Sequence, residues 1–144
     1  MIKQFQDEYR WLSNFWPCNV FYDHVLYPTV ENAYQAAKFP VENRQIFTYC
    51  SPFQAKKISH KAILSPDWHT KKIIIMFELL LQKYHKEPFS GWLLATGTQL
   101  IQEGNYHGDD FWGIDLKKGS GNNLLGIMIM CIRDELREQY NEGL

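Results

Sequence analysis

The segment PTVENAYQAAKF at residues 28–39 decides how the rest of this chain is interpreted. Thr29 is a good N-cap for a helix that follows it, because its hydroxyl can accept a hydrogen bond from the first turn. In such a helix Glu31, Gln35 and Lys38 are spaced at i, i+4 and i+7, so they lie on one face. Most other positions are small and apolar, which inverts the proportions of an ordinary surface helix. The sequence therefore predicts a largely buried helix with one narrow polar ridge, formed by these three residues.

The polar ridge has two interpretations. A buried carboxylate and a buried ammonium are costly unless they are paired or used. Glu31 and Lys38 therefore form either an ion pair at a solvent edge or two sides of a ligand site. Seven helical positions correspond to about 10 Å along the axis. This separation favours a ligand that bridges the two charges over direct neutralisation.

Composition limits the class of protein. The chain has 144 residues, of which 45% are hydrophobic and 15% aromatic. This predicts one well-packed domain over residues 1–144. The formal net charge is −1, which gives no support to a long nucleic-acid interface, since that needs a marked basic excess. A small anionic ligand needs only a few placed lysines or arginines and stays open.

The cysteines and the apolar runs indicate a soluble protein of the cytoplasm. Cys18, Cys50 and Cys131 are far apart and odd in number, so neither a disulfide framework nor a zinc ribbon is expected. The first ten residues are too polar for a signal peptide. The longest apolar runs are too short or too interrupted to span a bilayer.

Hydrophobic periodicity and turn residues predict a mainly helical α+β fold with a small antiparallel sheet. Asp23 and His24 read as the turn of a hairpin. Ser51 and Pro52 read as the cap and first position of a short helix. The expected elements are strands over 19–22 and 25–27, helices over 28–39, 42–48 and 51–60, a core helix from Trp68 to Tyr84 whose stripe includes Ile73, a helix or strand over 92–96, a strand over 100–103, and a core helix from Leu124 with Leu125, Ile129, Ile132 and Leu136 buried.

Four polar clusters stand apart from the core pattern. Two carboxylates from different segments, such as Glu31 and Asp109, could share acid and base work on one bond. Gly121, shortly before a helix, could let backbone amides approach a phosphate, although an ordinary loop and cap is the competing interpretation. The clusters are Arg10, Ser13 and Asn14; the polar ridge; Asp67 and Trp68; and residues 107–113 with 119–123.

Other kinds of chemistry lack a signature. His107, Asp109 and Asp110 are plausible metal ligands by type, but no H-x-x-x-H or H-E-x-x-H spacing accompanies them. There is no G-x-G-x-x-G after a strand, no G-K-[ST], and no nucleophile elbow. We therefore expect neither a metal nor a cofactor.

Taken together, the clusters resemble the NADAR superfamily, and in particular its YbiA-like N-glycosidases. The resemblance covers the chain from about Phe5 to Arg133. One departure stands out: Asn32 lies where the family commonly has a histidine. The motifs are, in order, LSNF (12–15), PTVENAYQAAKF (28–39), DW (67–68), DDFWG (109–113), GNNLLG (121–126) and IMCIR (129–133).

The resemblance implies a single YbiA-like domain that hydrolyses an N-glycosidic bond between a phosphorylated ribose and a base. YbiA-like members act on phosphoribosylamino-pyrimidine intermediates of riboflavin biosynthesis, and other members remove ADP-ribose from guanine bases. The expected partner is thus a small phosphoribosyl or ADP-ribosyl substrate. Nucleic acid enters only as an ADP-ribosylated substrate, and no membrane partner is expected.

The resemblance also implies roles for residues. Glu31 would stabilise the oxocarbenium-like sugar, with Asp109 positioning hydroxyls or assisting proton transfer. Lys38 would bind phosphate or attack the ribose as an amine. The alternative is a non-catalytic ADP-ribose- or nucleotide-binding module, which the Asn32 departure favours. The expected substrate-binding residues are Arg10, Ser13, Asn14, Gln35, Trp68, Trp112, Gly121 and Asn123.

Overall fold

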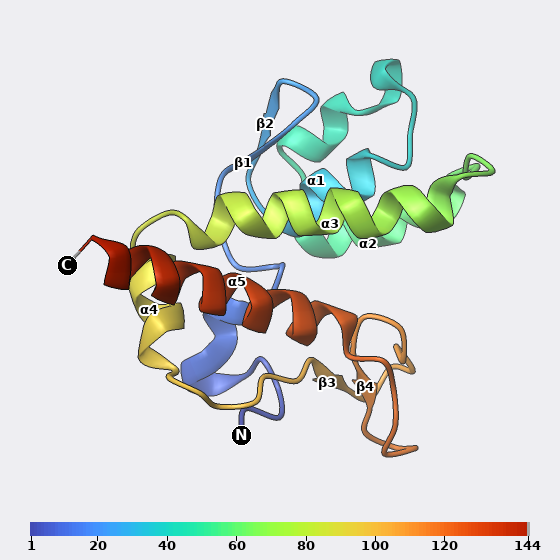
Figure 1. The fold of residues 1–144 in the computed structure, drawn as a ribbon. Helices are drawn as coiled ribbons and strands as arrows, with labels where there is room; N and C mark the ends of the chain where they lie inside the picture. The colour runs from blue at the N-terminus through green and yellow to red at the C-terminus, as the bar shows by residue number, and fades with distance from the viewer. Residues whose placement is uncertain (144) are drawn as a thin grey trace. The chain divides into compact units, whose positions relative to one another are not determined.

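The computed structural model describes residues 1–143, and Figure 1 shows them as a ribbon. Contacts divide the chain into two compact units. We call Asn14–Lys83 the middle unit, and Met1–Ser13 together with Tyr84–Leu144 the terminal unit. The one-domain prediction for residues 1–144 is not tested by this division.

Helices dominate, and each unit holds one two-stranded sheet, so the prediction of a mainly helical α+β fold is confirmed. The elements of the middle unit are β1 (Val20–Tyr22), β2 (Val25–Tyr27), α1 (Val30–Ala36), the 3-10 helices η2 (Val41–Asn43) and η3 (Gln45–Thr48), α2 (Pro52–Ile58), η4 (Ser59–Lys61) and α3 (Trp68–Tyr84). Those of the terminal unit are η1 (Asp7–Leu12), α4 (Phe89–Ala95), β3 (Gly104–Asn105), β4 (Ile114–Asp115) and α5 (Leu124–Glu142).

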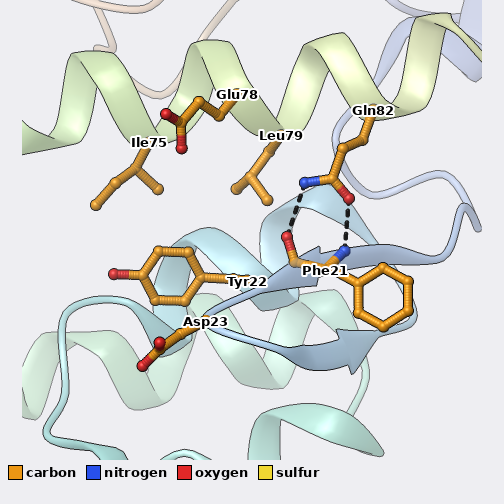
Figure 2. A pocket seen from close by; sticks show the side chains of 7 residues that line it. All are labelled: Phe21, Tyr22, Asp23, Ile75, Glu78, Leu79 and Gln82. Carbon is orange, nitrogen blue, oxygen red and sulfur yellow. Dashed lines mark hydrogen bonds between the residues drawn. The ribbon is translucent and has the colours of Figure 1, made fainter.

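The predicted hairpin is confirmed: β1 and β2 pair antiparallel. Asp23 and His24 both have positive φ, 49° and 65°. Two such residues form the turn whose twist matches that of the strands. The free edge of β1 is occupied by the side chain of Gln82 on α3, which accepts from Phe21 N at 2.7 Å and donates to Phe21 O at 2.8 Å (Figure 2). A glutamine amide thus replaces a third strand.

The helix α1 begins as predicted, because the Thr29 hydroxyl accepts from Asn32 N. All residues of α1 are buried, and the helix packs against α2, η3 and both hairpin strands (Figure 1). It ends at Ala36, earlier than predicted. Lys38 N bonds three residues back, to Gln35 O, so the chain tightens into a turn. Lys38 therefore lies just beyond the helix rather than in it.

The remaining middle-unit helices follow local signals with two corrections. Residues 42–48 form two 3-10 helices instead of one helix. In α3 the buried stripe includes Ile75, Met76 and Leu79. Ile73, which was predicted to begin the stripe, is 38% exposed, so that part of the prediction is wrong. The Ser51 cap is confirmed as a full capping box with Gln54.

The terminal unit is built on α5 and α4, which pack together. The predicted buried stripe of α5 is confirmed. Residues 92–96, expected to be a helix or a strand, are helical up to Ala95, where α4 ends. Arg133 of α5 is buried and donates to Thr96 Oγ1 and Gln99 O, at 2.9 and 2.8 Å. These bonds tie the end of α4 to α5.

The second sheet differs from the prediction. The strand expected over 100–103 is reduced to one bridge, between Ile101 and Ile2. The strands that form next, β3 and β4, are parallel and only two residues each. Among the described residues, no helix combines the length and the apolar character needed to cross a membrane. The cytoplasmic location stays a prediction.

Candidate functional site

The polar ridge begins with a buried carboxylate. Glu31 is only 7% exposed, and Gln35 Nε2 donates to its Oε1 at 2.7 Å. The backbone of Glu31 is anchored as well, since its N–H donates to Asn14 O at 3.1 Å. The i, i+4 spacing seen in the sequence therefore produces a direct hydrogen bond on one helix face. Gln35 holds the Glu31 carboxylate in one orientation.

Two residues that bond to Glu31 each carry a side-chain acceptor that lacks a partner. Asn14 Oδ1 and Gln35 Oε1 are buried, and neither has a hydrogen-bond partner within residues 1–143. The Asn14 amide nitrogen has only a weak contact, 3.5 Å from Met76 Sδ. A buried polar atom left unsatisfied costs about 1–3 kcal/mol. Both residues are hydrogen-bonded to Glu31, so the surroundings of this carboxylate retain unused acceptor capacity that hydroxyl groups can fill.

Lys38 lies over two aromatic rings. Its Nζ is 5.2 Å from the ring centroid of Tyr34 and 5.9 Å from that of Trp68. Burial lowers the pKa of Lys38, Glu31 acts to raise it, and the nearby Lys72 and Lys56 lower it further. Within the described part of the chain no carboxylate oxygen lies within 4 Å of Nζ. Of the two interpretations of the ridge, the solvent-edge ion pair between Glu31 and Lys38 is therefore not formed among the described residues.

The Asp67–Trp68 motif divides into two roles. Trp68 is 5% exposed and packs against Tyr34, with ring centroids 5.6 Å apart. It serves as a platform for the Lys38 ammonium. Asp67 is exposed, and its Oδ1 accepts from Ser65 Oγ at 2.7 Å. The bond from Ser65 is the main cause that lowers the pKa of Asp67, and the hydrogen bond and positive charge of Lys71 lower it further.

The side chain of Asn32 is fully used in holding the fold. Its Nδ2 donates to Phe47 O at 2.9 Å and to Cys50 O at 2.7 Å. Its Oδ1 accepts from Thr29 Oγ1 at 2.7 Å. Asn32 thus joins the start of α1 to the segment between η3 and α2. The departure from the family pattern falls at a structural position.

In the terminal unit, Asp109 organises its own loop. Its Oδ1 accepts from Phe111 N and Trp112 N, at 3.1 and 3.0 Å. Its backbone is held by Asn105, which accepts from Asp109 N at 2.9 Å and donates to Asp109 O at 2.8 Å. Sequence reasoning missed Asn105. The only signal was a polar residue in a turn-rich segment, which does not reveal burial.

The amides before α5 are already bonded. Residues 122–125 donate to the carbonyls of residues 110–113, over 2.8 to 3.3 Å. These bonds agree with the competing interpretation of the sequence, an ordinary loop and helix cap. A Cβ at Gly121 would lie 2.3 Å from Gly113 O, so close packing of two backbone segments accounts for the glycine. Its substrate-binding role stays a prediction without that support.

Asn123 is also used structurally. Its φ is 51°, in the left-handed region that asparagine tolerates. Its Nδ2 donates to Ile101 O at 2.9 Å, and its Oδ1 accepts from Glu103 N at 3.0 Å. These bonds fix residues 101–103 against the start of α5. A contact of this side chain with substrate stays a prediction.

The structure thus groups the predicted residues into two sets. One set surrounds Glu31 in the middle unit, and the geometry above connects its members. Whether Asp109 acts with Glu31 stays a prediction. The middle unit holds Asn14, Glu31, Gln35, Lys38 and Trp68, and the terminal unit holds Arg10, Ser13, Asp109, Trp112, Gly121 and Asn123.

Two hollows of the structure lie away from the predicted site residues. A hollow of about 290 Å³ separates the hairpin from α3 and is lined by Tyr22, Asp23 and Glu78 among others (Figure 2). Another, of about 350 Å³, lies in the terminal unit and is lined by Trp11, Trp92 and Gln99 among others. Neither contains a predicted site residue. Within residues 1–143, no three His, Cys, Asp or Glu side chains are grouped to hold a metal ion.

Comparison with known proteins supports one family. The model of the NADAR domain matches residues 2–137. A riboflavin biosynthesis protein of Vibrio vulnificus is 32% identical over 142 residues, which are 94% of this chain and 38% of that protein. A chloroplastic riboflavin biosynthesis protein of Zea mays is 33% identical over 129 residues, 79% of this chain and 20% of that protein. The chain therefore spans well under half of these two relatives.

A relative of similar length is the N-glycosidase YbiA of Escherichia coli. It is 32% identical over 137 residues, which are 90% of this chain and 83% of that protein. The NMR structure of E. coli YbiA matches with a TM-score of 0.82 and 27% identity. The match covers 99% of this chain and 90% of that one.

Proposed function

This chain belongs to the NADAR domain family, and from that premise we propose that it hydrolyses the N-glycosidic bond of a phosphorylated ribosyl compound. Two relatives named for riboflavin biosynthesis and one named N-glycosidase support this reaction class. The observation that carries the proposal is the buried carboxylate of Glu31, a residue bonded to Asn14 and Gln35, which each keep an unpartnered side-chain acceptor.

Glu31 suits the electrostatic demand of this reaction. Departure of the base leaves positive charge on the ribose, and a fixed carboxylate in a water-poor site stabilises that charge strongly. Gln35 keeps the carboxylate oriented through the 2.7 Å bond from its Nε2, so little reorganisation is needed. The same carboxylate can orient the attacking water.

The unpartnered acceptors suit a ribose. The unpartnered Asn14 Oδ1 and Gln35 Oε1 would accept hydrogen bonds from sugar hydroxyls, each of which needs an acceptor when buried. Binding would satisfy both atoms at once. A substrate without these hydroxyls leaves them unpaired, which is an effective basis for discrimination.

For the substrate we favour a phosphoribosylamino-pyrimidine intermediate of riboflavin biosynthesis. The names of the Vibrio and Zea relatives support this choice. An ADP-ribosyl group on guanine is the second candidate, and it shares the phosphorylated ribose. Release of free base from each compound, followed by chromatography, tests the proposal. Release from one of them is expected, and binding without release from any of them would instead favour a non-catalytic module.

The case for a non-catalytic module is weakened by Asn32. That residue was its sequence support, yet its amide group bonds to Phe47 O, Cys50 O and Thr29 Oγ1. The Asn32 side chain has structural partners of its own in this chain. It therefore carries no implication for hydrolysis.

Lys38 has two possible roles in the reaction. Its lowered pKa increases the neutral amine fraction near pH 7, which favours attack on the ribose C1. Its position at the end of the polar ridge also suits phosphate binding. Borohydride trapping in the presence of substrate separates the two. A trapped adduct that disappears in Lys38→Arg supports the nucleophile, whereas no adduct with activity retained in Lys38→Arg excludes it.

A further inference from the structure

Two buried aromatic rings support the end of the polar ridge. Tyr34 lies on α1, four residues before Lys38, and Trp68 is the first residue of α3. Both residues are buried, and their ring centroids are 5.6 Å apart with the ring planes inclined by 49°. Both belong to the middle unit. We call this pair of rings the aromatic seat.

The ammonium of Lys38 lies over the aromatic seat. Its Nζ is 5.2 Å from the ring centroid of Tyr34 and 5.9 Å from that of Trp68, and both distances are within the range of cation–π attraction. Within residues 1–143, no carboxylate oxygen lies within 4 Å of Nζ. A half-buried ammonium is costly without a compensating partner. The two rings therefore supply attraction that keeps this ammonium at one place.

We propose that Tyr34 is a positioning residue, whose ring acts with that of Trp68 to hold the Lys38 amine in place for the reaction; this inference rests on the proposed function. Sequence reasoning assigned no role to Tyr34. Buried aromatic side chains have few rotatable bonds and are locked by packing, which is what support for a reacting or binding group requires. Lys38 gains from this placement whether it attacks the ribose or binds phosphate.

The first test separates the ring of Tyr34 from its hydroxyl. Tyr34→Phe keeps the ring, and Tyr34→Leu removes it but keeps an apolar side chain. Ring faces favour the charged amine, so the pKa of Lys38 should fall by about 0.5 to 1 unit in Tyr34→Leu. NMR titration of the Lys38 ε-carbon, assigned by its absence in Lys38→Arg, measures this fall. Tyr34→Phe should titrate close to the wild type.

A second cation–π pair of the middle unit provides the matched control. The guanidinium carbon of Arg44 lies 5.1 Å from the ring centroid of Tyr22, outside the polar ridge. Tyr22→Leu removes this ring and should leave the pKa of Lys38 unchanged. An equal fall in Tyr22→Leu and Tyr34→Leu, or no fall in either, overturns the inference.

Kinetics on a phosphoribosyl substrate test the positioning role. Tyr34→Leu should lower kcat about tenfold and shift one limb of the pH profile to lower pH, the limb that Lys38→Arg abolishes. Tyr34→Phe should recover most of the kcat, and Tyr22→Leu should keep the wild-type profile. An unchanged profile in Tyr34→Leu overturns the inference and leaves the proposed function intact.

The NMR measurement separates this inference from the proposed function. A lower pKa of Lys38 in Tyr34→Leu supports the aromatic seat even if no glycoside is cleaved. If Tyr34→Leu does not fold, the wild type decides, because protons above ring faces are shielded. The ε-methylene protons of Lys38 should resonate upfield of those of the other lysines, and an ordinary lysine shift would overturn the seat.

Discussion

The polar ridge of α1 and the segment of residues 105–123 contain similar residue types but use them differently. In the ridge, the buried Gln35 Oε1 has no partner, and neither has Oδ1 of Asn14, whose backbone bonds to Glu31. In the 105–123 segment, the side chains of Asn105, Asp109 and Asn123 bond to backbone groups. Under the proposed function the unused capacity around Glu31 serves the substrate, whereas the used capacity of the 105–123 segment holds the backbone. If the proposed function holds, this distinction separates the proposed substrate-binding residues from the structural ones among residues that the motifs present alike.

The largest expected effect on stability comes from Asn32, which lies on the same helix as Glu31 but whose side chain bonds to the backbone. Asn32→Ala leaves the buried carbonyls of Phe47 and Cys50 without the hydrogen bonds that Asn32 Nδ2 donates to them. We expect the free energy of unfolding to fall by about 3 kcal/mol, since buried unsatisfied groups cost about 1–3 kcal/mol each. Urea denaturation measures this fall. The kcat/KM of the folded fraction should stay near wild type, and a large loss there would make Asn32 part of the site.

Asn123 provides the corresponding test in the terminal unit. Asn123→Ala removes the bonds to Ile101 O and from Glu103 N. A loss of about 2 kcal/mol in unfolding free energy is expected, from the lost bonds and the cost of the groups left behind. Thermal and urea unfolding both report it. If stability is unchanged while KM rises, Asn123 contacts substrate and the comparison fails at this residue.

Lys83 extends the comparison to a buried charged side chain. Burial lowers its pKa to about 7, against 10.5 as its ordinary value. Between these values the unfolded chain binds more protons than the folded one, so stability rises with pH in that window. Each unit of pKa difference corresponds to about 1.4 kcal/mol, so the rise from pH 7 to 9 is at most about 2.7 kcal/mol.

The variant Lys83→Met should lose this pH-dependent rise. Urea midpoints of wild type and variant at pH 7 and pH 9 provide the measurement. The free energy of unfolding of the wild type should rise from pH 7 to 9 while that of Lys83→Met does not, so the advantage of the variant over the wild type should shrink. A difference that is constant over this range would show that Lys83 keeps an ordinary pKa in the folded chain.

Asn14 gives the smallest effect and the sharpest contrast with Asn123. Asn14→Leu removes the unpartnered Oδ1 but keeps the backbone carbonyl that accepts from Glu31 N. Stability should stay within about 1 kcal/mol of wild type or increase, because an unsatisfied group is removed. The kcat/KM should fall about tenfold, which corresponds to about 1.4 kcal/mol of lost transition-state binding. Steady-state kinetics and urea denaturation, measured together, decide between the two roles.

Local rules predicted the parts of the fold that local sequence controls. The Thr29 cap, the turn at Asp23 and His24, and the buried stripe of α5 depend on residues a few positions apart. The polar ridge was predicted for the same reason. Its hydrogen bond from Gln35 to Glu31 is an i, i+4 contact.

Long-range bonds account for what the sequence did not predict. Asn105, Asn123 and Asn32 bond to backbone groups that no periodic pattern links to them. The glycine-rich sequence left open whether the amides of residues 122–125 meet a phosphate or form an ordinary cap, and carbonyls from residues 110–113 bond to them. Motif reasoning identifies which residues matter. It does not distinguish those that hold the backbone from those that remain available to a ligand.

Glu31→Gln tests the central claim most directly. A glutamine at this position can still accept from Gln35 Nε2, so the fold should persist, and Glu42→Gln on the exposed η2 is the matched control. Base release from the phosphoribosyl substrate should fall by about 10²–10³ in kcat, the usual cost of removing one electrostatic stabiliser. The control should equal wild type. A folded Glu31→Gln variant that releases base at the wild-type rate would contradict the account.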